Sequence, residues 1–320
     1  MYKTWILFIP LKTWILFIPL STNQKGNIMM KRNLLNSLIL AALAVPGAAM
    51  AADVETAEHK EGKHVIPESA HTVTSNVSLV SNYLYRGISQ TGGNPALQGG
   101  FDYAHSSGIY AGIWGSNVSW IGDSLVTSGG TIGATSSSLE LDTYFGYKSS
   151  FATDFSYDVG YLRYNYPGEY PGTMVAGAAK ADTDEIYGAI GYKWVTLKYS
   201  HGLGDTFGVD DASGTSYVEL NASYTLADAG VTLGAHYGKQ TYKGTAADAL
   251  KATYIAGISQ DPTYSDYKLS ASKDFSGYVV GLAYSKTNAD AGGFYTATRL
   301  DGSTVDLGKG TAVLSLAHSF

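Results

Sequence analysis

The sequence predicts an all-β fold: a transmembrane antiparallel β-barrel of about 12 strands with short periplasmic turns and long extracellular loops. Three observations predict it. Apolar and polar residues alternate along about twelve segments. The connections between these segments are alternately short and long. No window after the N-terminal region has the eighteen or so apolar residues of a membrane-spanning helix. Because every backbone N–H and C=O in hydrocarbon must be paired within the protein, such a sheet has to close.

The composition narrows the class of protein. The 320 residues include 38 Gly and 25 Tyr, only 15% are charged, and none is Cys. This blend is too polar for a helical membrane protein and too rich in aromatic residues for a disordered one. The absence of Cys excludes disulfides and thiolate metal sites.

The N-terminal region is predicted to be a targeting segment and not part of the folded barrel. Residues 1–29 contain the nine residues KTWILFIPL twice in tandem, which indicates a mis-assigned upstream extension with the true start at Met29 or Met30. Residues 30–51 have the basic, apolar and small-residue regions of a signal peptide, with cleavage directed by Ala49 and Ala51. Residues 52–74 are charged and aperiodic, and we expect a mobile periplasmic leader there.

The processed chain is acidic. Five of the 21 basic residues and none of the 27 acidic residues precede the expected cleavage point, so 16 basic and 27 acidic residues remain, a net charge of −11. A basic footprint for nucleic acid is absent.

The barrel is expected to occupy residues 75–320. Its predicted strands are, in order, 76–85, 96–105, 108–118, 138–147, 154–165, 185–193, 194–201, 215–226, 230–239, 265–273, 277–286 and 311–320. They are rich in Tyr, Val and Thr and alternate in polarity. The prolines after the signal peptide all lie outside these segments, as they must if they are not to remove ladder donors.

The connections distinguish a membrane barrel from a secreted β-sandwich, which would show the same alternation. Tight turns such as HSSG, LADAG and KDFSG alternate with long polar loops at 119–137, 166–184, 202–214, 240–264 and 287–310. Short turns on one rim and long loops on the other are typical of outer-membrane barrels. An even number of strands puts both chain ends on the short-turn rim, and the excess of Tyr fits aromatic girdles at the two interfaces.

The last strand carries a second indication. Leu314, Leu316, His318 and Phe320 share one face, and a terminal aromatic residue on such a face resembles the signal by which barrel-assembly machinery recognises its substrates. His318 departs from the pattern, because an apolar residue is more usual at that place.

The other register of the strands is expected to line the interior. Its candidate pore-lining residues are Arg86, Asp102, Glu140, Asp142, Asp158, Glu185, Lys198, Glu219, His236 and Lys268. Charges are expensive against lipid, which supports this assignment. The set predicts either an acidic, water-filled pore that favours cations or a filled interior cross-linked by Glu–Lys pairs. Twelve strands fall between filled barrels of about eight strands and open channels of 16–18, so we expect a narrow or partly plugged pore.

The sequence gives only weak indications of an anion gate, a phosphate-binding loop or an enzyme. Arg86 at the end of the first strand could act as an anion gate, although such a residue more often pairs with a carboxylate or a lipid phosphate. HGLGDTFG (201–208) resembles a phosphate loop but lacks its Lys-Ser/Thr pair. A lipid-modifying enzyme would need Ser, His and an acidic or Asn partner together on the barrel wall. His236 and Ser223 share a register on adjacent strands, but such pairs also arise by chance in a Ser-rich barrel. We therefore expect no enzyme activity, no catalytic residue, no metal site and no cofactor.

Several stretches resemble one family. Residues Ser75–Trp120, Tyr157–Gly168, Asp184–Trp194 and Asp266–Ser285 are similar to the TorF family of porins, also known as the Gcw_chp family of proteobacterial proteins. The resemblance covers most of the processed chain, and its motifs are distinctive as a set. It implies an outer-membrane barrel with a channel role and supplies no catalytic or substrate-binding residues.

The sequence as a whole therefore predicts a porin-like channel in the outer membrane of a Gram-negative bacterium, reached by Sec-type export. We expect passive diffusion of small hydrophilic solutes with a mild preference for cations. The expected partners are membrane lipid and lipopolysaccharide, the barrel-assembly machinery, and small solutes or ions. The alternative is a non-conducting barrel with a structural or surface-binding role.

Overall fold

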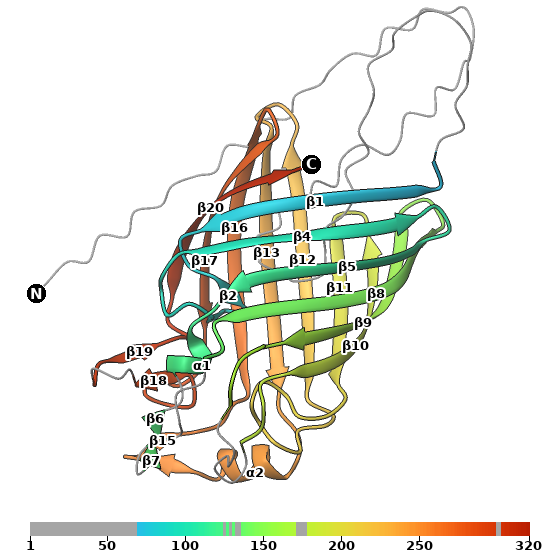
Figure 1. The fold of residues 1–320 in the computed structure, drawn as a ribbon. Coiled ribbons are helices and arrows are strands. Elements are labelled where there is room, and N and C mark those ends of the chain that lie inside the picture. Colours follow the sequence, from blue (N-terminus) through green and yellow to red (C-terminus); the bar gives the residue numbers. More distant parts are fainter. Residues whose placement is uncertain (1–68, 124–125, 128–129, 132–135, 171–177, 299–301) are drawn as a thin grey trace, which may run out of the picture. The chain divides into compact units, whose positions relative to one another are not determined.

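The computed structural model describes residues 69–123, 126–127, 130–131, 136–170, 178–298 and 302–320, which all belong to one compact unit. Twelve strands form a closed antiparallel barrel in the order β1-β20-β17-β16-β13-β12-β11-β10-β9-β8-β5-β4 (Figure 1). Their bounds are β1 His71–Val80, β4 Ala96–His105, β5 Ile109–Asn117, β8 Leu139–Phe151, β9 Phe155–Asn165, β10 Thr183–Tyr192, β11 Val195–Gly202, β12 Ser216–Leu226, β13 Val231–Thr241, β16 Tyr264–Phe275, β17 Tyr278–Thr287 and β20 Thr311–Ser319.

The remaining elements are small and belong to the long connections. Four two-stranded sheets are β2 Leu84–Tyr85 with β3 Ile88–Ser89, β6 Val126–Thr127 with β7 Gly130–Thr131, β14 Tyr254–Ile255 with β15 Ile258–Ser259, and β18 Thr296–Thr298 with β19 Thr304–Asp306. The helices are α1 Trp120–Asp123 and α2 Thr245–Lys251. In the described part of the chain, neither helix has the length and apolar character to cross a membrane.

The predicted twelve-stranded antiparallel barrel is confirmed, with one correction at its first strand. The segment 76–85 was predicted as one strand, but β1 covers His71–Val80 and the chain then turns inward. The strand therefore includes the residues from 71 to 74, which the sequence had suggested were leader. The reason is that Leu84 and Tyr85 pair with residues 88 and 89 in a separate buried hairpin instead of continuing the barrel ladder.

The two rims of the barrel differ as predicted. Neighbouring barrel strands are joined by turns of two to four residues at one rim and by long connections at the other. Both helices and the small sheets β6–β7, β14–β15 and β18–β19 gather at the long-loop end (Figure 1). Tight turns at the other rim use left-handed backbone, as at Lys193 (φ 52°) and at Gly277 (φ 91°).

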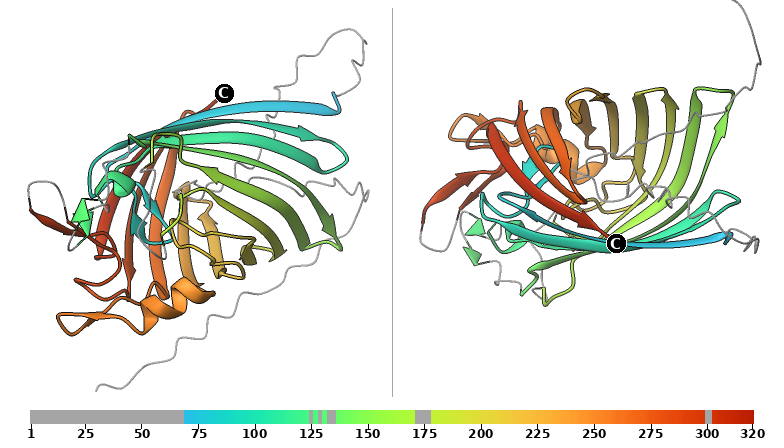
Figure 2. Two further views of the ribbon diagram at one scale, coloured as in Figure 1. Left: turned by 60° about the horizontal axis from the view of Figure 1, so that its bottom comes forward. Right: turned by 90° about the horizontal axis from the view of Figure 1, so that it is seen from above.

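The barrel closes between its first and last strands. β1 pairs with β20 from Asn76↔Ser319 to Val80↔Ser315. Beyond this ladder, Ser75 and Phe320 exchange two backbone hydrogen bonds of 3.2 and 2.8 Å. Figure 2 shows the resulting ring of strands from its end. Both described ends of the chain therefore lie at the short-turn rim.

The two faces of the wall have opposite chemistry. Large apolar side chains from every barrel strand point outward and are exposed, including Phe101, Phe145, Leu220, Leu269 and Leu314. The alternate residues point inward and are largely polar or aromatic. The outer surface is thus the apolar belt that a barrel presents to lipid.

Tyrosine side chains lie on both faces of the wall, whereas the sequence predicted them in aromatic girdles at the membrane interfaces. Inside the barrel, tyrosine rings lie over glycines of neighbouring strands: Tyr144 over Gly112, Tyr110 over Gly146, Tyr187 over Gly160 and Tyr217 over Gly238. A missing Cβ makes room for each ring, so the abundance of Gly and the abundance of Tyr have a common packing cause.

This packing gives a testable expectation. A Cβ at Gly160 would lie 2.6 Å from the Tyr187 hydroxyl oxygen and 2.8 Å from the Phe145 carbonyl oxygen. Gly160→Ala should therefore lower the free energy of unfolding by about 1–3 kcal/mol. Gly188→Ala on the neighbouring strand is the control, because its Cβ would meet only Val159 at 4.0 Å. Urea titration of the refolded barrel in detergent measures both, and equal stability of the two variants would contradict the packing role.

Candidate functional site: the bore and its inward hairpin

A buried hairpin crosses the bore, the space enclosed by the twelve barrel strands. We call residues 82–91, which include β2 and β3, the inward hairpin. Its residues are buried except for a partly exposed Arg86. Arg86 (φ 47°) and Gly87 (φ 77°) at its tip both have left-handed backbone, as a two-residue hairpin turn requires. A Cβ at Gly87 would lie 2.7 Å from the Cβ of Asp266, so only glycine allows the tip to approach β16 this closely.

The inward hairpin is fastened to strands around the whole ring. The Tyr83 hydroxyl donates to Glu140 Oε1 on β8 at 3.0 Å, and the Tyr85 and Tyr164 hydroxyls lie 2.6 Å apart. The β-turn tip reaches Asp266 on β16 and Thr287 on β17. Because these partners lie on opposite parts of the wall, the hairpin spans the bore near its long-loop end.

Arg86 makes the most polar contacts between the inward hairpin and the wall. Its guanidinium forms a two-pronged pair with Glu185, with N–O distances of 3.0 and 2.8 Å, and also donates to Gln240 Oε1 at 2.8 Å. It lies 4.2 Å from the ring centre of Tyr217. The side chains of Arg86 and Glu185 are only 7% and 3% exposed. Arg86 therefore pairs with a carboxylate inside the barrel, which is the more ordinary of the two roles that the sequence left open.

The wall formed by β4, β8, β9 and β10 is acidic and rich in tyrosine. Asp102 accepts a hydrogen bond of 2.5 Å from Tyr144, and Asp158 accepts one of 2.6 Å from Tyr110. Glu140 and Asp142 lie on β8 and are buried. All the carboxylates predicted on this wall do point inward.

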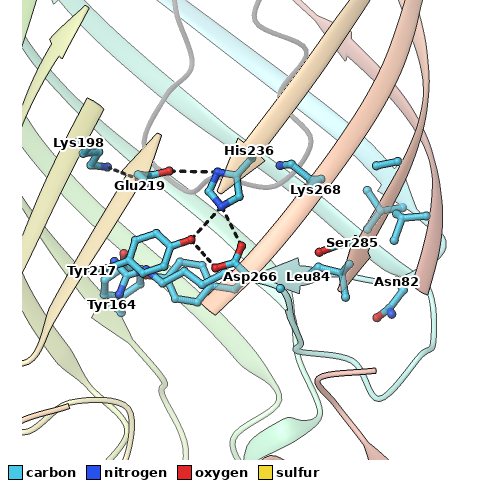
Figure 3. A pocket seen from close by; sticks show the side chains of 16 residues that line it. Asn82, Leu84, Tyr164, Lys198, Tyr217, Glu219, His236, Asp266, Lys268 and Ser285 are labelled. Carbon is cyan, nitrogen blue, oxygen red and sulfur yellow. Dashed lines mark hydrogen bonds and ion pairs between the residues drawn. The ribbon is translucent and has the colours of Figure 1, made fainter. Parts of the chain in front are cut away.

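The opposite wall carries a row of ionisable side chains that contact one another. His236 Nε2 lies 2.8 Å from Asp266 Oδ2, and the Tyr217 hydroxyl donates to the other oxygen of Asp266 at 2.7 Å. Glu219 lies 3.7 Å from His236 Nδ1, and Lys198 lies 4.0 Å from Glu219. Figure 3 shows Lys198, Glu219, His236 and Lys268 side by side on β11, β12, β13 and β16, with Tyr217 and Asp266 below them.

A cavity lies between this row and the inward hairpin (Figure 3). Its lining combines Arg86 and Gly87 of the hairpin with Lys198, Glu219, His236, Asp266 and Lys268 of the wall, together with Ser285, Ala283 and Val313. The structure thus brings half of the predicted pore-lining residues to one chamber. Asp102, Glu140, Asp142, Asp158 and Glu185 lie on the opposing wall and outside its lining.

The geometry offers no esterase arrangement around His236. Ser223 pairs with Gly234 across the β12–β13 ladder, and His236 pairs with Asn221. Both ring nitrogens are occupied, Nδ1 by Asn221 Oδ1 at 2.7 Å and Nε2 by Asp266 and Tyr217. Within the described ranges, no group of three or more His, Cys, Asp or Glu side chains is arranged to hold a metal ion.

The residues of the expected assembly signal lie on the outside of the last strand. Leu314, Leu316 and Phe320 are exposed. His318 stacks on Tyr278 with ring centres 4.6 Å apart, and its Nδ1 lies 2.7 Å from the Gly277 carbonyl oxygen. His318 is thereby integrated into the outer aromatic surface. Ala49 and Ala51, the expected cleavage residues, lie outside the described residues.

Two important bore residues were missed by the sequence reasoning. Asp266 shares the inward register with Lys268, two residues away, so the alternation could have found it. Tyr217 shares the register of Glu219 in the same way. It was overlooked because tyrosine was assigned to the lipid interfaces. For the inward hairpin itself, the only local signal is the Arg-Gly pair at its tip.

Comparison with solved structures finds matches of low sequence identity and low TM-score. A chain from a study of the in-meso crystallization of membrane proteins is 9% identical, with a TM-score of 0.40, covering 78% of this chain and 83% of that one. The outer membrane protein OprD from Pseudomonas aeruginosa is 15% identical with a TM-score of 0.32, covering 77% and 65%. OccAB3 from Acinetobacter baumannii is 10% identical with a TM-score of 0.37, covering 80% and 66%. The chain thus spans about two thirds of the length of the latter two, and we draw no functional inference from such low scores.

Sequence comparison is more decisive. No curated protein matches the chain. A family model described as a bacterial protein of unknown function (Gcw_chp) matches residues 64–320, which is most of the chain. The protein therefore belongs to the Gcw_chp family.

Proposed function

We propose that the protein is an outer-membrane channel for the passive diffusion of small hydrophilic solutes, with a mild preference for cations. One observation carries the proposal: a closed wall that is apolar outside and lined with charge inside. Apart from the buried pair Glu140 and Asp142, the inward carboxylates of Asp102, Asp158, Glu185, Glu219 and Asp266 still outnumber the inward basic groups of Arg86, Lys148, Lys198 and Lys268 in the described bore. An excess of fixed negative charge favours cations over anions.

Planar-bilayer recordings test this proposal. We expect small conductance steps and a reversal potential in a salt gradient that shows cations to be more permeant than anions. Asp158→Asn should reduce this selectivity, because Asp158 places a carboxylate in the bore, where it accepts a hydrogen bond from the Tyr110 hydroxyl. Asp228→Asn, in the exposed turn after β12, is the matched control and should leave selectivity unchanged. Absence of conductance steps would reject the channel, and a preference for anions would reject the charge argument.

A second candidate function is favoured by the inward hairpin. A segment that spans the bore and is fastened to opposite parts of the wall fits a non-conducting barrel whose loops bind a surface partner. The two candidates differ in whether the bore conducts at all when the hairpin is in place, so the same recordings distinguish them.

The proposed location brings further expectations. We propose Sec-type export with cleavage after residue 51, recognition of the last strand by the barrel-assembly machinery, and membership of the TorF porin group within the family. Lys239 and Lys286 are exposed on the outer face close to the long-loop rim. Their position suits the phosphate groups of lipopolysaccharide, because basic side chains there would face anionic head groups.

A further inference from the structure

Two carboxylates lie side by side in an aromatic enclosure away from the cavity. Glu140 and Asp142 occupy successive inward positions on β8 and are 1% and 0% exposed. In the barrel ladder, Asp142 pairs with Trp114 on β5 and with Tyr164 on β9. Tyr83 of the inward hairpin packs edge-on against Trp114, with ring centres 5.6 Å apart. The pair is thus bounded by aromatic residues of the wall and of the hairpin.

These carboxylates lack the partners that buried charges need. Glu140 Oε2 and both side-chain oxygens of Asp142 have no hydrogen-bond partner among the described residues. Of the surrounding tyrosine hydroxyls, those of Tyr83 and Tyr166 bind Glu140, that of Tyr164 pairs with Tyr85, and that of Tyr144 donates to Asp102, so none of them serves Asp142. Arg86, the cation of the same hairpin, is held by Glu185 and Gln240. Buried polar atoms in native proteins nearly always find a partner, so these three oxygens require one.

We propose that Glu140 and Asp142 bind a divalent cation, such as Ca²⁺ or Mg²⁺, at the base of the inward hairpin. Two adjacent carboxylates supply the two negative charges that such an ion neutralises, and carboxylate oxygen is its preferred ligand. The faces of Trp114 and of the neighbouring tyrosines also favour positive charge. No third acidic or histidine ligand joins the pair in the described chain, so water and the hydroxyl oxygens of Tyr83 and Tyr166, which lie at Glu140, complete the coordination. Such a site is weak, with a dissociation constant of about 10⁻⁴–10⁻³ M.

The ion would have a structural consequence. Tyr83 joins the inward hairpin to Glu140, so neutralising the carboxylates fixes the hairpin on the side of the bore opposite to its tip. The competing arrangement is a proton shared between the carboxyl groups of Glu140 and Asp142, which would reduce their negative charge without a metal ion. The inference rests on the barrel fold and not on conduction, so it can fail while the proposed channel function stands.

Terbium luminescence of the refolded full-length protein tests the site. Tb³⁺ replaces Ca²⁺ and emits when a nearby Trp is excited, and Trp114 is the ladder neighbour of Asp142. We expect sensitised emission that millimolar Ca²⁺ displaces, and at least a tenfold loss of apparent Tb³⁺ affinity in Asp142→Asn. Asp102→Asn is the control, since Asp102 is an inward carboxylate that accepts a hydrogen bond from Tyr144 and does not belong to the Glu140–Asp142 pair. Trp114→Phe should lose the emission yet keep an increase of Tm on addition of Ca²⁺.

A thermal-unfolding measurement distinguishes a bound cation from a proton shared by Glu140 and Asp142. Ca²⁺ should raise the Tm of the wild-type protein and of Asp102→Asn, but not that of Asp142→Asn or Glu140→Gln. If one of the two variants fails to refold, the other suffices, because either loses one of the two charges. Equal Tb³⁺ affinity of wild type and Asp142→Asn would overturn the proposal. So would a Tm that is insensitive to Ca²⁺ in wild type and higher in Asp142→Asn with chelator present, since a protonated pair predicts that result.

Discussion

Removal of the inward hairpin is expected to raise the single-channel conductance of the refolded barrel several-fold. In the variant, residues 84–89 are replaced by two glycines, so that Tyr83 and Gln90 remain. The physical reason is that this segment contacts β9, β10, β12, β13, β16 and β17 and therefore occupies the cross-section of the bore. Planar-bilayer recording measures the change directly.

The matched control removes a hairpin of similar size that lies elsewhere. Tyr254–Ser259, comprising β14 and β15, belongs to a long loop, and Tyr254 is 66% exposed. Its replacement by two glycines should leave conductance unchanged. If the two deletions have the same effect, the inward hairpin is not the constriction. If the wild type shows no conductance and only the variant that lacks residues 84–89 conducts, the native protein is the non-conducting barrel and the inward hairpin is its plug.

Loss of the Arg86–Glu185 pair should have the largest effect on stability. Arg86→Ala leaves the Glu185 carboxylate almost fully buried without its cation, and we expect a loss of about 3–5 kcal/mol in the free energy of unfolding. Arg86→Lys keeps the charge but cannot form the two-pronged contact, so an intermediate loss is expected. Urea unfolding in detergent, followed by tyrosine and tryptophan fluorescence, gives these values.

A double-mutant cycle separates the pair from its surroundings. Glu185→Gln alone leaves a buried guanidinium unpaired and should be destabilising as well. The double variant Arg86→Ala/Glu185→Gln should be more stable than the sum of the single losses predicts, because neither charge is then left alone. Strict additivity of the two substitutions would show that the ion pair is not what fastens the hairpin.

The barrel wall was predictable because a single physical rule governs each of its strands. Each strand meets lipid on one face and the bore on the other, so polarity alternates along segments such as 215–226 and 277–286. Turn length then distinguishes the two rims, whereas strand boundaries are less well determined, as the first strand shows. An antiparallel barrel of about twelve strands, with its charged register facing inward, follows from these observations.

The inward hairpin escaped this rule for a physical reason. Residues such as Leu84 and Ile88 are apolar because they pack against the aromatic lining of the bore, not because they meet lipid. Period-two patterning records burial against either environment in the same way, so 81–85 looked like the continuation of β1. The long-range partners of Tyr83 and Arg86 lie 57 and 99 residues away, and alternation along one segment carries no information about them.

The two backbone bonds between Ser75 and Phe320 have a consequence for how the molecule is made. Because the ring closes only where β20 pairs with β1 and β17, an intermediate that lacks β20 keeps unpaired backbone groups on both of those strands, and acyl chains cannot solvate them. We therefore expect the other strands to stay out of the lipid until β20 is available to pair with both of its neighbours.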